Sequence, residues 1–497
     1  MSKLLEMNNI CKYFGGVKAL QNVDFSMDYG EIRCLVGENG SGKSTLIKII
    51  SGVHKPEDGS KINFDGKNIH HMNSRESVRL GIQVIYQDLS LFPTLSVAEN
   101  ICFSDNIESG KKLVNFKKAV KKTEEVLKQL GIKINPKKKI TELSIAERQL
   151  VAIARAIAAE AKLVIMDEPT ASLTKKEVEV LLGIIKDLQS KKVSTIFVSH
   201  KLDEVMSIAE SVTVLRDGKK VGDYKASELD NDKLAFLMTG KSFKKEILPE
   251  YKSDGEKPIL QILNLTKKDN YKDVSLDLHK GEIVGIIGLL GSGRTEMALS
   301  LFGMNKPDSG HIILEDKEIK INNIDDAIKY GIGYVPEDRL SLGLVMEQSV
   351  SKNMILPILE RISKHGIIDK ELQKEEVEQS VGNLKIKIPS FVAPVKTLSG
   401  GNQQRVVLGK WIGINPKILI LDSPTVGVDV AAKASIYEII KKLASQGMGI
   451  IMISDEVEEI LYNTNTIYTM ASGRITGKFN SADLSERELY EETNKHH

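Results

Sequence analysis

The chain has 497 residues, which is too long for one typical domain and provides enough material for two or three sizeable hydrophobic cores. Its 69 basic and 67 acidic side chains nearly balance, so the overall charge does not indicate nucleic acid binding. The three cysteines, Cys11, Cys34 and Cys102, form no CxxC pair, which argues against a disulfide framework or a structural zinc site and is typical of a reducing cytosol.

Membrane insertion and secretion are not indicated either. No apolar run approaches the roughly 18 residues of a membrane span, and the N-terminal MSKLLEMNN lacks the apolar core of a signal peptide. Lysine-rich stretches at residues 116–122 and 136–139 are interpreted as solvated surface. We therefore expect no transmembrane segment and no nucleic acid partner, and any action at a membrane would require another protein.

The first motif along the chain is GENGSGKST, at residues 37–45. An apolar run precedes it and a helical run follows it, so the sequence predicts a strand, a glycine-rich phosphate-binding loop (P-loop) and a helix. Such a loop surrounds phosphate oxygens with backbone N–H groups, while Lys43 adds positive charge and the Ser44 hydroxyl can bind magnesium. The predicted phosphate contacts are Gly37, Glu38, Asn39, Gly40, Ser41, Gly42, Lys43, Ser44 and Thr45.

Residues 90–155 are predicted to form an inserted helical subdomain. Its clearest amphipathic run is VKKTEEVLKQLG, with Gly131 as the expected C-cap.

Two short apolar runs that follow, LVIM and TIFVS, are expected to be buried parallel strands. The first ends in Asp167 and Glu168 and the second in His200. Because ligands bind beyond the carboxyl ends of such strands, these three side chains should meet Lys43 at one sheet edge. Taken alone, Asp167 could be a helix N-cap and His200 a structural histidine, and only the surrounding motifs favour a site.

The same series of motifs occurs again about 250 residues later. GLLGSGRTE (288–296) matches the P-loop, GIGYVPED (331–338) matches GIQVIYQD (81–88), KTLSGGNQQ (396–404) matches TELSIAERQ (141–149), and KILILDSPT (417–425) matches KLVIMDEPT (162–170). We therefore predict two tandem α/β domains at residues 1–240 and 258–497, each with a mainly parallel sheet, joined by a polar linker at 241–257.

In this order the motifs resemble the nucleotide-binding domain of ABC ATPases, twice. The set comprises a P-loop, Gln87, an LSGG-type signature, the Asp167–Glu168 pair and His200. The resemblance implies two tandem ABC-type P-loop NTPase domains that use ATP and Mg²⁺. The fused copies and the VPEDR string at 335–339 resemble the ATPase subunit of monosaccharide importers of the ribose, galactose and xylose type.

The resemblance also implies a role for each matching residue. Asp167, Ser44 and Gln87 would hold magnesium, Glu168 would orient or activate the attacking water, and Lys43 and His200 would contact phosphate. Phe14 would stack on adenine. The neighbouring Tyr13 is an alternative for that role, and burial in the core is an alternative for Phe14.

The second copy departs from the family pattern at nearly every catalytic position. Arg294 replaces the P-loop lysine, Glu337 the glutamine, Ser423 the glutamate and Asp455 the histidine, while Asp422 and Thr295 remain. Nucleotide contacts are still predicted at Gly288, Gly293, Arg294 and Thr295, but we expect poor hydrolysis because the planar guanidinium does not fit a cradle shaped around an ammonium.

In the family that the chain resembles, the two domains pack head to tail, and each nucleotide lies between the P-loop of one domain and the signature of the other. The first P-loop would face LSGGN (398–402), with Ser399, Gly400 and Gly401 as nucleotide contacts. The second P-loop would face LSIAE (143–147), which lacks both glycines and adds a carboxylate. The intact motifs thus fall in one composite site and the altered ones in the other.

The function implied is ATP-driven import of a monosaccharide, with the protein bound peripherally at the cytoplasmic face of the cell membrane. Its partners would be integral-membrane permease subunits and, through them, an external solute-binding protein. The stretches 88–101 and 340–354 are expected to receive permease helices, with ordinary core packing as the alternative. A nucleoside importer ATPase and a soluble twin ABC ATPase acting on ribosomes are the alternative functions, although the latter class keeps both sites intact and has a longer charged arm.

Overall fold

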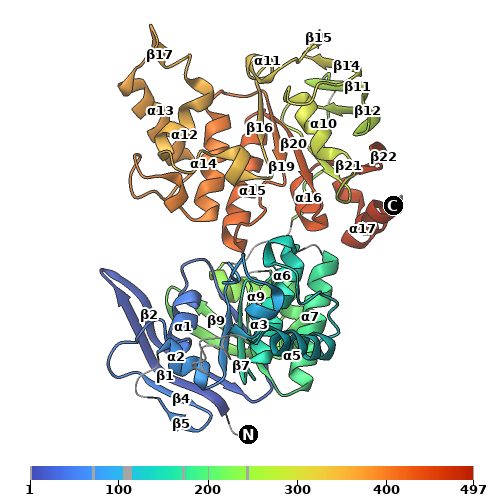
Figure 1. Ribbon diagram of the computed structural model, residues 1–497. Helices are drawn as coiled ribbons and strands as arrows, with labels where there is room; N and C mark the ends of the chain where they lie inside the picture. Colours follow the sequence, from blue (N-terminus) through green and yellow to red (C-terminus); the bar gives the residue numbers. More distant parts are fainter. Residues whose placement is uncertain are drawn as a thin grey trace. The chain divides into compact units, whose positions relative to one another are not determined.

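The computed structural model describes residues 3–69, 73–103, 115–170, 173, 175–199, 201–241, 246–253 and 255–495. The chain divides into two compact units, Met1–Phe243 and Lys244–His497 (Figure 1). Each unit is built around its own hydrophobic core or cores.

A six-stranded sheet forms the centre of the first unit. Its order is β10 (Lys219–Lys225), β9 (Ser211–Arg216), β3 (Ile32–Val36), β8 (Ser194–Val198), β7 (Leu163–Asp167) and β6 (Ile82–Ile85). All neighbours pair in parallel except β10, which is antiparallel to β9. The inner strands are mainly apolar because both of their faces are covered.

The two faces of this sheet pack against different layers. Cys34, Met166 and Phe197 belong to the core shared with α6 (Ile145–Ala158) and α7 (Lys175–Ser190). Their chain neighbours Leu35, Ile165 and Ile196 belong to the opposite core, with α1 (Lys43–Ile50). A four-stranded antiparallel sheet completes that side, in the order β2 (Val17–Asp28), β1 (Lys3–Phe14), β4 (Lys61–Phe64) and β5 (Lys67–Asn68).

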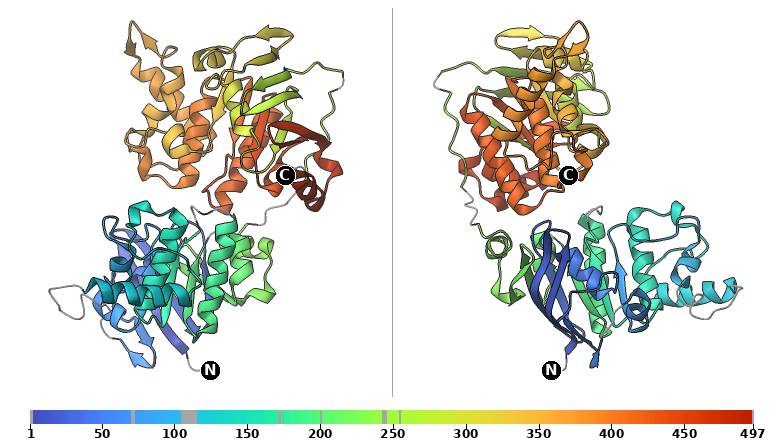
Figure 2. Two further views of the ribbon diagram at one scale, coloured as in Figure 1. Left: turned by 45° about the vertical axis from the view of Figure 1, so that its right-hand side comes forward. Right: turned by 90° about the vertical axis from the view of Figure 1, so that its left-hand side faces the viewer.

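Helices α3 (Val97–Ile101), α5 (Phe116–Gln129) and α6 pack together as the predicted helical subdomain (Figure 2). Helix α5 ends as the sequence indicates. Gly131 has a left-handed backbone (φ 69°), and its N–H donates to Lys128 O at 3.1 Å. The next N–H, of Ile132, donates to Leu127 O at 2.9 Å, which completes a Schellman motif. The remaining α-helices within the described part of this unit are α2 (Ser74–Arg79), α8 (Leu202–Ile208) and α9 (Asn231–Thr239).

The second unit repeats this topology strand by strand. Its main sheet has the order β22 (Arg474–Asn480), β21 (Thr466–Ala471), β13 (Ile283–Ile287), β20 (Gly449–Ser454), β19 (Ile418–Asp422) and β16 (Ile332–Val335). The antiparallel sheet has the order β12 (Tyr271–Leu278), β11 (Leu260–Lys267), β14 (Ser309–Leu314) and β15 (Lys317–Ile319). The predicted α/β class with mainly parallel sheets is confirmed in both units.

The helices of the second unit are α10 (Arg294–Leu301), α11 (Ile324–Lys329), α12 (Val350–Ile355), α13 (Lys370–Asn383), α14 (Gly400–Ile412), α15 (Val430–Ser445), α16 (Val457–Asn463) and α17 (Glu486–Asn494). A small hairpin, β17 (Ser363–Lys364) and β18 (Ile367–Ile368), precedes α13. None of the helices in the described part of the chain has the length and apolar character that a membrane span requires.

Part of the segment expected to be a linker lies along the second unit. Asn465 Nδ2 donates to Pro249 O at 2.9 Å, and the Tyr251 hydroxyl donates to Lys280 O at 2.9 Å. The Tyr251 ring also stacks on the ring of His279, with 5.4 Å between the ring centroids. The division between the units, after Phe243, falls within residues 241–257.

Candidate functional site

The first P-loop connects β3 to α1 and depends on glycine for its path. Gly42, directly before α1, has φ 103°, and a Cβ there would lie 2.6 Å from Leu20 Cδ2 and 2.7 Å from Ala19 O. Gly40 also has a positive φ, of 85°, but a Cβ there would meet nothing within 4 Å. The loop is therefore packed against the antiparallel sheet at Gly42 and open at Gly40, and Asn39 and Ser44 are also exposed.

The N terminus of α1 has the properties of an anion site. No side chain caps this helix, so its first N–H groups and the positive end of its dipole point into the loop. The side chain of Lys43 is only 7% exposed, and its ammonium donates to Gly37 O at 2.7 Å and Glu38 O at 2.9 Å. The loop thus combines a cation with a helix N terminus, which fits a bound phosphate.

Asp167 and Glu168 lie at the carboxyl end of β7, close enough to act on the P-loop. Burial and the neighbouring Glu168 carboxylate raise the pKa of Asp167, while the charges of Lys43 and Lys48 partly lower it. Glu168 has a left-handed backbone (φ 48°), and its N–H donates to Val198 O of the adjacent strand β8 at 3.0 Å. The structure therefore brings Lys43, Asp167 and Glu168 together.

The other predicted residues of this site are distributed as follows. Gln87 is exposed in the turn that follows β6, the strand beside β7. Magnesium prefers oxygen ligands and is usually held by one or two carboxylates together with substrate phosphates. Asp167, the Ser44 hydroxyl and the Gln87 amide are such ligands at this sheet edge, so the residue types fit. His200 lies outside the described residues.

Phe14 is the last residue of β1 and is not part of the core. Its side chain is 43% exposed, and its ring makes an edge contact with the His54 ring, with centroids 5.2 Å apart. The Lys12 ammonium lies 5.6 Å from the Phe14 ring centroid. Tyr13 is equally exposed, at 44%. The core alternative for Phe14 is therefore wrong, and its stacking role stays a prediction.

A buried carboxylate that the sequence analysis did not single out connects two strand ends of the first unit. Glu204 of α8 accepts from the Thr170 hydroxyl at 2.6 Å and from the Ser199 hydroxyl at 3.1 Å. Thr170 follows β7 and Ser199 follows β8, so Glu204 braces the edge that carries Asp167 and Glu168. In the second unit, Glu459 accepts from the Thr425 hydroxyl at 2.8 Å. Thr170 and Glu204 recur in the second copy as Thr425 and Glu459, and this repetition could have identified them from the sequence.

In the second P-loop, carboxylates of the same unit act on Arg294. The N–H groups of the Arg294 guanidinium donate to Ser454 O and, at 3.5 Å, to Leu289 O. Burial lowers the pKa of Arg294, and four carboxylates oppose that shift, those of Asp455, Asp422, Glu337 and Glu296. These carboxylates favour the charged guanidinium, so the second P-loop has negative charge of the protein near its own cation.

The second-unit counterparts of the predicted magnesium ligands bond to one another. Asp422 is 1% exposed and accepts hydrogen bonds from the Thr295 hydroxyl and, at 3.1 Å, from the Tyr334 hydroxyl. Burial raises the pKa of Asp422, although these hydrogen bonds and Arg294 partly lower it. A metal at this position would have to break these internal bonds.

The two signatures differ in how their helices begin. Ser144 forms a capping box with Glu147 at the start of α6, in which Glu147 N donates to Ser144 Oγ at 3.2 Å and Ser144 N donates to Glu147 Oε2 at 2.8 Å. Ser399 directly precedes α14, but its side chain does not cap the helix, and its hydroxyl accepts from Asn402 Nδ2 at 3.0 Å. The N terminus of α14 is therefore available to an anion, whereas that of α6 already holds a carboxylate.

The signature glycines also have a role within the second unit. A Cβ on Gly401 would lie 2.6 Å from Ala432 Cβ on α15, so this glycine lets the two helices approach each other. From the sequence, Gly400 and Gly401 were predicted only as nucleotide contacts.

The apolar stretch 340–354 is partly on the surface. Leu340, Leu342 and Val345 are 49%, 60% and 48% exposed, whereas Leu344 and Val350 are buried. Phe92 in the corresponding stretch of the first unit is 41% exposed. Core packing therefore accounts for only part of these two stretches.

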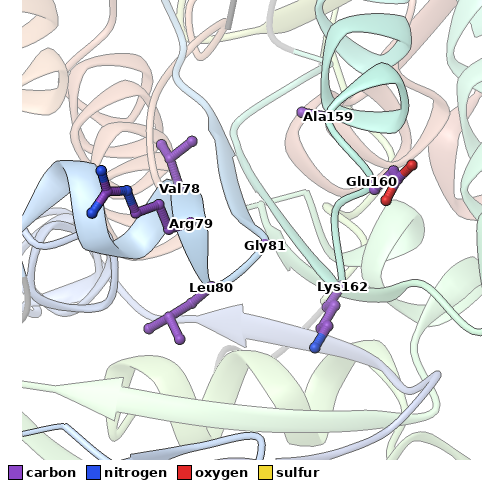
Figure 3. A pocket seen from close by; sticks show the side chains of 7 residues that line it. All are labelled: Val78, Arg79, Leu80, Gly81, Ala159, Glu160 and Lys162. Atoms are coloured by element: carbon purple, nitrogen blue, oxygen red, sulfur yellow. The ribbon is translucent and has the colours of Figure 1, made fainter. Parts of the chain in front are cut away.

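A separate pocket of about 510 Å³ lies at the opposite edge of the first sheet, where β6 and β7 begin. It is lined by residues 78–81 and by Ala159, Glu160 and Lys162 (Figure 3). None of the predicted site residues lines it.

Comparison with known proteins gives a consistent result. A family model described as ABC transporter matches residues 20–171 and 271–426. The chain is 41% identical to the xylose import ATP-binding protein XylG of Geobacillus kaustophilus, over 98% of both chains. It is 40% identical to the ribose import ATP-binding protein RbsA 1 of Agrobacterium fabrum, over 98% of this chain and 95% of that one. A solved structure of the ATP-binding cassette MJ1267 matches 48% of this chain and 100% of that one, at 27% identity and a TM-score of 0.44.

Substituting Glu204 by alanine should destabilise the first unit. The change leaves the buried Thr170 and Ser199 hydroxyls without their acceptor, which costs about 1–3 kcal/mol. In calorimetric unfolding, Glu204→Ala should lower the transition temperature of the first unit, and Glu459→Ala should lower that of the second unit. Glu179→Ala, at an exposed position of α7, is the control and should leave both unchanged. An unshifted transition in Glu204→Ala would contradict the bracing role.

Substituting Asp422 by asparagine should change how stability depends on pH. Because the pKa of Asp422 is raised in the folded protein, the folded state binds the proton more tightly, and stability falls as pH rises from about 4 through the raised pKa. The asparagine side chain would carry no charge and could still accept the two hydroxyls. Asp422→Asn should therefore raise the Tm of the second unit at pH 8, by roughly 2–4 °C, and the gain should shrink towards pH 4. The exposed Asp483 provides the control Asp483→Asn, and an equal gain at both pH values would exclude charge as the cause.

Proposed function

Because this chain belongs to the ABC transporter family of ATP-binding proteins, we propose that it hydrolyses ATP to power the import of a monosaccharide. The observation that carries this proposal is its similarity, along nearly its whole length, to import ATP-binding proteins named for xylose and ribose. Both P-loops and both signatures lie within that length, so the comparison includes the duplicated architecture and not one domain alone.

We propose that the first P-loop, Asp167 and Glu168 form the competent ATP site. In phosphoryl transfer, positioning and positive charge provide most of the catalysis. Lys43 and the uncapped N terminus of α1 would bind the phosphate oxygens, and Glu168 would orient or activate the water that attacks them. Asp167, Ser44 and Gln87 would hold Mg²⁺, which when bound neutralises phosphate charge. His200 would contact the transferred phosphate, and Phe14 would stack on adenine.

We propose that the signature at Ser399–Gly401 completes this competent site. Its support is chemical, because the N terminus of α14 has no side-chain cap and can present N–H groups to a phosphate. The other combination would join Arg294, on which four carboxylates act, to an α6 N terminus that Glu147 already caps. That second site would bind nucleotide through Gly288, Gly293, Arg294 and Thr295 but hydrolyse it poorly.

Import also requires a path across the membrane. We propose that integral-membrane permease subunits provide this path and dock on the exposed apolar residues of 88–101 and 340–354 at the cytoplasmic face. An external solute-binding protein would deliver the sugar to the permease and contact this chain only indirectly.

Variants of the two P-loop sites should differ strongly in activity. Glu168→Gln should lower steady-state phosphate release at least about 100-fold, because removal of a catalytic base or transition-state contact has effects of this size. Arg294→Ala should retain a substantial part of the wild-type rate. Nucleotide binding should persist in Glu168→Gln, which controls for folding. Equal losses in the two variants would disprove a single competent site.

The partners can be identified by affinity capture. The tagged chain should be isolated from gently solubilised native membranes in the presence of a non-hydrolysable ATP analogue, and the retained proteins identified by mass spectrometry. We expect a polytopic permease and a sugar-binding protein. A nucleoside-binding protein would change the substrate class, and ribosomal proteins without a permease would contradict import.

A further inference from the structure

Arg339, the last residue of the VPEDR string that begins at the end of β16, has no role in the mechanism above. It begins η3 (Arg339–Gly343), a short π-helical turn. Asp338 caps this turn, because its carboxylate accepts from the N–H groups of Leu340 and Ser341, both at 3.0 Å. The backbone of Arg339 is thus fixed at the start of the partly exposed stretch 340–354.

The side chain of Arg339 joins this turn to two other segments. Its Nη1 donates to Val426 O at 2.6 Å and its Nη2 to Gly427 O at 3.2 Å, in the loop after β19. Its Nε donates to Gln403 Oε1 at 3.4 Å, in the first turn of α14. A single guanidinium therefore links the segment after β16, the loop after β19 and the helix that begins with the signature.

Two glycines make room for this guanidinium. A Cβ on Gly400 would lie 3.0 Å from Arg339 Nη2, and a Cβ on Gly427 would lie 3.2 Å from Arg339 Nη1. Gly400 is a signature residue, and Gln403 N donates to Ser399 O at 2.9 Å. Arg339 therefore lies beside Gly400 of the signature and is connected to Ser399 through Gln403.

The first unit lacks this link, which gives a comparison within one molecule. Asp88 corresponds to Asp338, and LSL (89–91) then matches LSL (340–342), so the first unit has no residue that corresponds to Arg339. A different contact is common to both units: Arg155 of α6 donates to Ser90 O at 2.9 Å, and Lys410 of α14 donates to Gly343 O at 3.0 Å. Within the described residues, the additional link to the start of the signature helix occurs only in the unit whose signature is intact.

We infer that Arg339 is a positioning residue for the competent ATP site. It holds Ser399, Gly400 and Gly401 at a fixed position relative to the segment after β16, so that a displacement of that segment moves the signature. This inference rests on the proposed function, in which that segment meets the permease and that signature meets the nucleotide. A lysine cannot replace Arg339, because a single ammonium cannot donate along the divergent directions of the planar guanidinium.

The test compares Arg339→Lys and Arg339→Gln with the wild-type full-length chain. We expect kcat for ATP hydrolysis to fall about tenfold in both variants, with KM for ATP changed less than about twofold, because positioning affects the reaction more than binding. Hydrogen exchange should become faster at residues 400–403 and stay unchanged at residues 145–148 of α6. Arg487→Lys, at a position whose side chain is 87% exposed, is the matched control and should behave as wild type.

Two results would overturn the inference. One is a kcat within twofold of wild type in Arg339→Lys. The other is a lower Tm with faster exchange throughout the second unit, which would mean that Arg339 only stabilises the fold. If the wild-type chain itself shows no ATPase activity that depends on Glu168, the proposed function fails, and the exchange at residues 400–403 still tests what Arg339 holds in place.

Discussion

The parallel order of β3, β8, β7 and β6 is the constraint on which the site of the first unit depends. Strands covered on both faces are mainly apolar, and the polar side chains of the site lie where the strands end. Because these strands run in the same direction, their carboxyl ends share one edge. Lys43 and Asp167 are therefore close enough to influence each other electrostatically, although they are far apart in sequence. Glu204 then keeps two of these strand ends together from below the surface.

Comparison of the two copies distinguishes residues that maintain the fold from residues that take part in the chemistry. Thr170 and Glu204 are retained as Thr425 and Glu459, with the same hydrogen bond. The changed positions are those around the phosphate cradle, where Arg294 is surrounded by carboxylates that come from four different places in the second unit. Three of these carboxylates, those of Glu296, Glu337 and Asp455, stand where the first unit has Thr45, Gln87 and His200. The two units thus share a scaffold and differ in electrostatics.

Local patterns in the sequence were sufficient to predict the P-loop, the alternation of strands and helices and the end of α5 at Gly131, because each depends on neighbouring residues. The contacts that depend on long-range packing were not predictable. Arg339 donates to a carbonyl 87 residues away, and Gly401 is needed because α15 passes close by. The hydrogen bond from Thr295 to Asp422 depends on how the start of α10 packs against the end of β19, which no sequence pattern indicates. Glu147 was recognised as an added carboxylate, but the capping box that it forms was not.

The different starts of α6 and α14 have a consequence for how free energy is distributed between the empty and the loaded protein. A side-chain cap typically stabilises a helix by about 1 kcal/mol. Helix α6 has this stabilisation permanently, through Ser144 and Glu147. Helix α14 lacks it and can obtain the equivalent only from an anion that approaches its first turn. The start of α6 is thus stabilised in the absence of a ligand, whereas the start of α14 is less stable without one. Binding of an anion there would therefore add the stabilisation that α14 lacks.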